Sequence, residues 1–147
     1  MLHLVLLLVH TKKVHLKQRE VSVINFEEIR DRIFRRSKGD TQDSIERGEL
    51  RERVVSCVLQ KMKDNKQILD FVKTPKYGPA DLIDGIDFYV IIMKLERVVI
   101  PIQVTGYRFV EEHKRKHPLI DVVAVPDEEE KREEVTRSQI EQIIQKF

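Results

Sequence analysis

Two apolar segments separated by a short charged connection constrain the fold of this chain more than any other feature. Residues 85–91 and 100–106 are each rich in isoleucine and valine, and residues 94–97 between them are mostly charged. The simplest link between two such segments is a β-hairpin. Each segment also carries a polar side chain where we expect the sheet to end, Asp87 in the first and Gln103 in the second.

Alternation along the second segment places its polar residues on one face. Residues in a strand point to opposite sides in turn, so Gln103 and Thr105 share a face that Val104 does not. If the hairpin pairs Asp87 near Gln103, a carboxylate and an amide oxygen come within reach of one cation, which suits Mg²⁺ or Mn²⁺. A plainer interpretation is that Asp87 only starts a strand and Gln103 only ends one, because polar residues are common at strand ends.

At these residues the chain resembles the PD-(D/E)XK nuclease superfamily, which has the restriction-endonuclease-like fold. In that family an acidic residue precedes a hairpin whose second strand carries Glu-x-Lys or Gln-x-Lys. A helix with an acidic residue comes before the hairpin, and a helix and a strand follow it. Here a helical stretch opens near Glu49, and residues 107–116 and 119–125 fit the later positions. The resemblance covers residues 44–125.

The resemblance implies a metal-dependent nuclease that hydrolyses DNA phosphodiester bonds. Its implied catalytic residues are Glu49, Asp87, Gln103 and Thr105, and its implied ligands for Mg²⁺ or Mn²⁺ are Asp87, Gln103 and Glu49. The chain departs from the family at Thr105, which stands where the pattern has lysine. Threonine cannot supply a positive charge to orient the attacking water or to stabilise the transition state.

Nearby cations in the sequence offer a replacement for that lysine. The candidates are Lys94, Arg108 and Lys114, and the sequence does not choose among them. The alternative function is a catalytically inactive protein of the same fold that binds nucleic acid or acts as an assembly partner, with a homodimer as one expected assembly. For Glu49, an ordinary surface ion pair is the alternative to a metal ligand, because charged residues surround it.

Basic residues after the hairpin predict where nucleic acid would bind. A formal net charge of +2 gives no strong overall attraction, so any attraction must come from local patches. The cluster Lys114, Arg115 and Lys116 directly follows the candidate site, and Arg108 lies just before it. We expect these residues to contact the phosphate backbone of nucleic acid, with DNA as the expected partner, although a solvated helix face explains them equally well.

Length and apolar spacing predict one α/β domain with a mixed central β-sheet flanked by helices. A chain of 147 residues can bury a core as a single domain. The resemblance implies a restriction-endonuclease-like core at residues 44–125, and we expect residues 1–26 to form an N-terminal strand extension. We expect helices at 27–36, 44–63 and 135–147 and a first core strand at 68–72.

The N-terminal run and the single cysteine bear on the compartment. Residues 1–9 are apolar but lack a basic leader and a cleavage site, and they are shorter than the roughly 20 residues that span a bilayer. We therefore expect a buried strand and no membrane partner. Cys57 is the only cysteine, which excludes an intramolecular disulfide and points to the cytoplasm. Its spacing from Val54 and Val58 predicts a packed thiol.

Overall fold

The computed structural model describes residues 26–39 and 41–147, so the predicted strand extension lies outside the described residues except for Phe26. Two helices open this part of the chain, α1 (Phe26–Gly39) and α2 (Gln42–Asp64). The hydroxyl of Thr41 caps α2 by accepting a hydrogen bond of 3.3 Å from the amide of Ser44. Both helices confirm the sequence prediction. No helix in the described part of the chain is long and apolar enough to cross a membrane.

A four-stranded mixed sheet forms the centre of the molecule, with strand order β1-β2-β3-β4. Its strands are β1 (Asp70–Lys73), β2 (Phe88–Met93), β3 (Arg97–Thr105) and β4 (Asp121–Ala124). The first three strands are antiparallel and β4 runs parallel to β3. The predicted hairpin is therefore the β2–β3 pair, and the predicted class, a mixed sheet flanked by helices, is confirmed.

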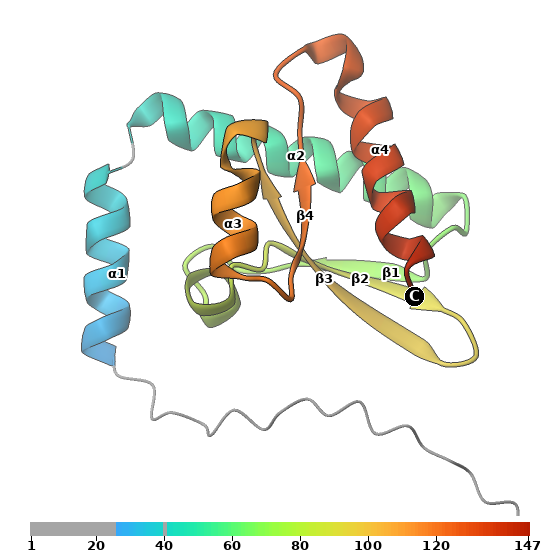
Figure 1. Ribbon diagram of the computed structural model, residues 1–147, viewed down its shortest axis with the longest axis horizontal. Coiled ribbons are helices and arrows are strands. Elements are labelled where there is room, and N and C mark those ends of the chain that lie inside the picture. The colour runs from blue at the N-terminus through green and yellow to red at the C-terminus, as the bar shows by residue number, and fades with distance from the viewer. Residues whose placement is uncertain (1–25, 40) are drawn as a thin grey trace, which may run out of the picture.

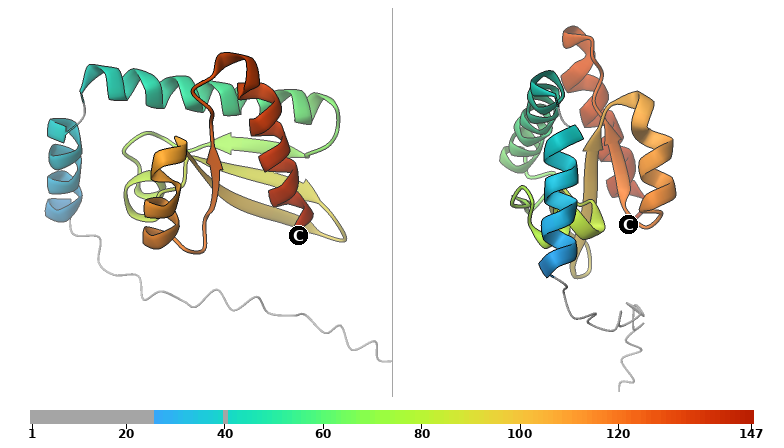
Figure 2. Two further views of the ribbon diagram at one scale, coloured as in Figure 1. Left: turned by 45° about the horizontal axis from the view of Figure 1, so that its top comes forward. Right: turned by 90° about the vertical axis from the view of Figure 1, so that its left-hand side faces the viewer.

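The core lies on one face of this sheet. Phe88, Val90 and Ile102 point from the sheet into a cluster completed by α2 and by α4 (Glu129–Gln145). Figures 1 and 2 show α3 (Val110–Lys116) and α4 on opposite sides of β4, with α2 crossing behind the sheet. The sheet is thus held between helices mainly at its β3–β4 side.

The open edge of β4 is closed by a side chain of α4. The amide nitrogen of Gln139 donates to the carbonyl of Ala124 at 2.7 Å, and its carbonyl oxygen accepts from the Ala124 backbone amide at 2.8 Å. Gln139 thereby makes the two hydrogen bonds that a neighbouring strand would make.

The second face of the sheet is less covered, both on β1 and along the hairpin. Val72, Met93 and Val99 are between 52% and 55% exposed, whereas Val90 and Ile100, on the core face, are no more than 1% exposed. This contrast matches the alternation expected along β2 and β3.

The prediction of a packed thiol at Cys57 is wrong. The buried face of α2 is formed by Val55, Val58, Leu59 and Met62, and Cys57 is exposed. Of the two valines whose spacing predicted the packed thiol, Val58 is buried and Val54 is half-buried. The buried face is therefore turned away from position 57, because one residue changes the direction of a helical side chain by about 100°.

Candidate active site

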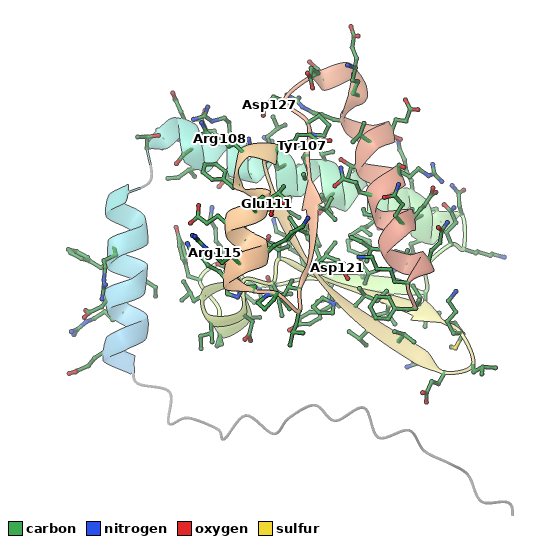
Figure 3. All side chains as sticks on the ribbon, in the orientation of Figure 1. Tyr107, Arg108, Glu111, Arg115, Asp121 and Asp127 are labelled. Carbon is green, nitrogen blue, oxygen red and sulfur yellow. The ribbon has the colours of Figure 1, made fainter. Side chains whose placement is uncertain are left out.

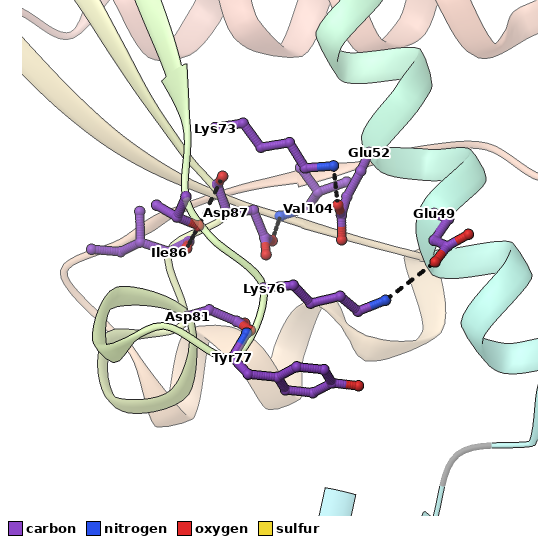
Figure 4. Close-up of polar contacts among 10 residues, drawn as sticks. Glu49, Glu52, Lys73, Lys76, Tyr77, Asp81, Ile86, Asp87 and Val104 are labelled. Carbon is purple, nitrogen blue, oxygen red and sulfur yellow. Dashed lines mark hydrogen bonds and ion pairs between the residues drawn. The ribbon is translucent and has the colours of Figure 1, made fainter. Parts of the chain in front are cut away.

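Asp87 and Gln103 lie at the same end of the hairpin. Its last pair is Phe88 with Ile102, and each of the two residues lies one position beyond that pair. The Asp87 backbone amide donates to the carbonyl of Ile102 at 3.0 Å, and Oδ2 of Asp87 accepts from the amide of Val104 at 2.6 Å (Figure 4). The two residues that the sequence singled out thus lie at the same end of the hairpin, and their sharing of one cation stays a prediction.

Thr74 fixes the backbone that leads into Asp87. Its amide donates to the Asp87 carbonyl at 2.9 Å, and its hydroxyl lies 2.6 Å from the carbonyl oxygen of Ile86 and 3.1 Å from that of Asp87. The hydroxyl has one hydrogen to donate, so it shares or alternates between the two acceptors. The start of β2 is therefore anchored to the residue after β1.

Gln103 is buried, and its carbonyl oxygen is unsatisfied. The side chain is 6% exposed, and Oε1 has no hydrogen-bond partner among the described residues. Its amide nitrogen lies 3.3 Å from the point where a Cβ on Gly85 would stand, and Gly85 has a φ of 66°. A buried carbonyl without a partner costs about 1–3 kcal/mol and calls for an explanation such as an ion. An amide oxygen beside a carboxylate fits a hard divalent cation.

Glu49 does not join Asp87 in a cluster of acids. It lies on α2, where its carboxylate is 3.5 Å from the ammonium of Lys76. Among residues 26–39 and 41–147, no group of three or more histidine, cysteine, aspartate or glutamate side chains is placed to hold a metal. The described contact of Glu49 is thus the surface ion pair that the sequence left open, and its role as a ligand stays a prediction.

The structure separates the three candidate replacements for the missing lysine. Thr105 is 5% exposed at the end of β3. Lys94 lies in the turn at the opposite end of the hairpin, about 20 Å from Asp87 at roughly 3.3 Å per residue, so it cannot serve this site. The guanidinium of Arg108 stacks 4.6 Å from the centre of the Phe109 ring, and Lys114 pairs with Glu111 at 3.6 Å.

Two lysines that the sequence reasoning missed lie closer to Asp87. Lys73 ends β1 opposite Phe88, and Lys76 follows in the loop. Figure 4 shows both side chains extending toward α2, where Lys73 pairs with Glu52 at 2.7 Å. The sequence predicted a strand at residues 68–72 but not its neighbour in the sheet. Its antiparallel pairing with the first strand of the hairpin is what brings Lys73 and Lys76 toward Asp87, and no local pattern reveals which strands pair.

No protein-family model, curated protein or solved structure matches this chain. The resemblance to the PD-(D/E)XK superfamily therefore rests on the residues and element order of the chain itself.

Asp81, another acid near Asp87 in the sequence, has a turn-forming role. Its carboxylate accepts a hydrogen bond of 2.8 Å from the backbone amide of Tyr77.

The basic residues after the hairpin differ in how far they are neutralised. Lys116 donates to Glu112, and this hydrogen bond, with the charge of Lys116, lowers the pKa of the Glu112 carboxyl from its ordinary value. Lys114 has Glu111 beside it, whereas Arg115 has no ion-pair partner in the described part of the chain. Figure 3 shows Arg108 and Arg115 at opposite ends of the segment formed by η2 (Tyr107–Phe109) and α3.

Proposed function

We propose that this protein is a metal-dependent nuclease that hydrolyses DNA phosphodiester bonds, with the Asp87–Gln103 pair at its centre. The observation that carries the proposal is the buried Oε1 of Gln103, which has no partner among the described residues and lies at the hairpin end that also carries the Asp87 carboxylate. The order α2–β1–β2–β3–α3–β4 supports it, because the resemblance to the PD-(D/E)XK superfamily predicted a helix, a hairpin, a helix and a strand in this order.

Asp87 and Gln103 would hold Mg²⁺ or Mn²⁺ through one carboxylate and one carbonyl oxygen, and Glu49 would complete the set by turning from Lys76. A metal bound here supplies Lewis acidity toward the scissile phosphate and a lowered pKa for bound water. The hydrogen bond from Val104 to Oδ2 orients the Asp87 carboxylate before any ligand binds.

Lys76 supplies the positive charge that Thr105 lacks in this proposal. Its pair with Glu49 is long, and both side chains are about half exposed, so the pair separates at small cost. Movement of Glu49 toward the metal would release the Lys76 ammonium, which can then stabilise the negative charge that develops on the phosphate.

Cleavage of end-labelled single-stranded, duplex and branched DNA in Mn²⁺ or Mg²⁺ tests the proposal. We expect Asp87→Ala to abolish cleavage and Lys76→Ala to slow it. Lys94→Ala removes the same charge in the distant turn and should cleave at the wild-type rate. Equal cleavage by wild type and Asp87→Ala, or no cleavage of any substrate by the folded protein, contradicts the proposal.

The second candidate is an inactive protein of this fold that binds nucleic acid or acts as an assembly partner. Two observations favour it, the uncharged Thr105 and the lack of a three-ligand group in the described residues. An inactive binder should hold labelled DNA equally well in EDTA and in Mg²⁺, leave it intact, and retain this affinity in Asp87→Ala.

As an assembly partner, the protein has a surface that a homodimer could use. This surface is the exposed sheet face around Val72, Met93 and Val99, and sedimentation velocity would detect the dimer.

A further inference from the structure

An arginine-lined pocket lies between α2 and the segment after β4. Its volume is about 300 Å³, and its lining is formed by Arg47, Leu50, Arg51, Pro126, Asp127 and Arg132. The lining therefore contains three guanidinium groups and one carboxylate. We call it the arginine pocket.

Arg51 is fixed in the wall of the arginine pocket. Its side chain is only 16% exposed, and Nη2 lies 3.1 Å from Oδ1 of Asp127. A Cβ on Gly106 would lie 2.6 Å from the same nitrogen, so the guanidinium packs directly on the backbone after β3. A nearly buried cation with a largely exposed acid as its partner leaves donors available to a second anion.

Arg132 shapes the opposite wall. Its Nε donates to the Pro126 carbonyl at 3.2 Å and its Nη2 to the Asp127 carbonyl at 2.6 Å. These bonds hold the segment that carries Asp127, which Figure 3 shows just beyond the end of β4. The carbonyls do not neutralise the guanidinium, so its charge still acts on the pocket.

Arg47 completes the positive surface from α2. Its Nε donates to the Asp43 carbonyl at 3.2 Å, and its terminal nitrogens have no hydrogen bond to a described residue. The side chains of Asp43 and Glu46 line the adjoining hollow rather than this pocket. The arginine pocket therefore carries a net charge of about +2 from its own lining.

We propose that the arginine pocket binds a phosphate group of the nucleic-acid backbone. Guanidinium groups present paired donors that match phosphate oxygens, which a single ammonium cannot do. Gly106 follows Thr105, and Gln103 is three residues earlier, so the pocket wall begins about 10 Å along β3 from the candidate site. Resting on the proposed nuclease function, the inference adds a contact to a phosphate away from the scissile one.

Fluorescence anisotropy with labelled single-stranded and duplex oligonucleotides, in EDTA and over a range of salt, tests the inference. Arg47→Ala should weaken binding roughly three- to tenfold at 0.1 M salt for every sequence. It should also make the negative slope of log affinity against log salt less steep by about 1. Arg97→Ala removes the same charge at the distant end of the hairpin and should leave both quantities unchanged. Circular dichroism melting checks that both variants fold.

Arg51→Lys gives a second variant, in which the positive charge is conserved. It keeps the positive charge but loses the paired donors, so we expect weaker binding with little change in the salt slope. Competition with inorganic phosphate separates a nucleic-acid contact from a site for the free anion. Displacement of phosphate from wild type at a roughly three- to tenfold lower oligonucleotide concentration than from Arg47→Ala supports the inference.

Three results would overturn it. They are no oligonucleotide binding by wild type, identical binding by Arg47→Ala and Arg97→Ala, and a site that takes inorganic phosphate while oligonucleotides bind unaffected by it. Because binding is measured in EDTA, the inference can fail while cleavage persists. It can also stand if the protein binds DNA through Arg47 yet never cleaves it.

Discussion

At Gln103, a feature that lowers the stability of the folded protein is also the feature on which the proposed function depends. Its buried Oε1 lacks a partner among the described residues, so the folded protein carries a desolvated carbonyl there. Gln103→Met replaces the amide with an apolar group of similar length. In EDTA we expect the free energy of unfolding to stay level or rise by about 1 kcal/mol, measured by urea denaturation. A loss above about 1 kcal/mol would show that the amide has a structural partner.

Asp70 makes stability depend on pH. Hydrogen bonds from the Lys63 ammonium and from the Phe71 amide lower the pKa of its carboxyl below the ordinary value. A lowered pKa in the folded state stabilises the protein above the unfolded pKa, about 3.9, and this contribution is lost as the pH falls through the folded pKa. Asp70→Asn should therefore lower the urea midpoint at pH 7, and the difference should vanish near pH 2. A difference that is constant with pH would contradict this account.

At the scale of elements, the hairpin register can be tested with two matched substitutions. Val90 is 1% exposed on the core face, whereas Val99 is 54% exposed on the other face. Val90→Thr buries a hydroxyl and should cost about 1–3 kcal/mol, while Val99→Thr should change stability by less than about 0.5 kcal/mol. A slip of β3 by one residue would turn Val99 to the core face, so similar losses in the two variants would show that the register is different.

Local patterns predicted the elements but not how distant elements meet. The hairpin and α2 were predictable because alternation and helical spacing are properties of neighbouring residues. The packing of Cys57 on α2 was predicted wrongly, because this side chain is exposed. Lys73 and Lys76 were missed, and Lys94 was wrongly considered, because their distances from Asp87 depend on strand pairing across the sheet.

At the scale of the whole molecule, a small net charge hides an uneven distribution of cations. The formal charge is only +2, yet the arginine pocket gathers three guanidinium groups around one carboxylate. The pocket and the Asp87–Gln103 pair both lie near the same end of β3, since Gly106 contacts Arg51 and Val104 contacts Asp87. A nucleic-acid strand could therefore contact both, which joins the two proposals in one binding surface.

Calorimetric titration of Mn²⁺ tests the central claim most directly, because it reports on the metal site without requiring turnover. We expect one site in the wild type, no measurable binding in Asp87→Ala, weaker binding in Gln103→Met, and tighter binding in Gln103→Glu, which adds a negative charge to the ligand set. Lys94→Ala should bind as the wild type does. Equal Mn²⁺ binding by wild type and Asp87→Ala, or none by either folded protein, would contradict a metal centre at the end of the hairpin.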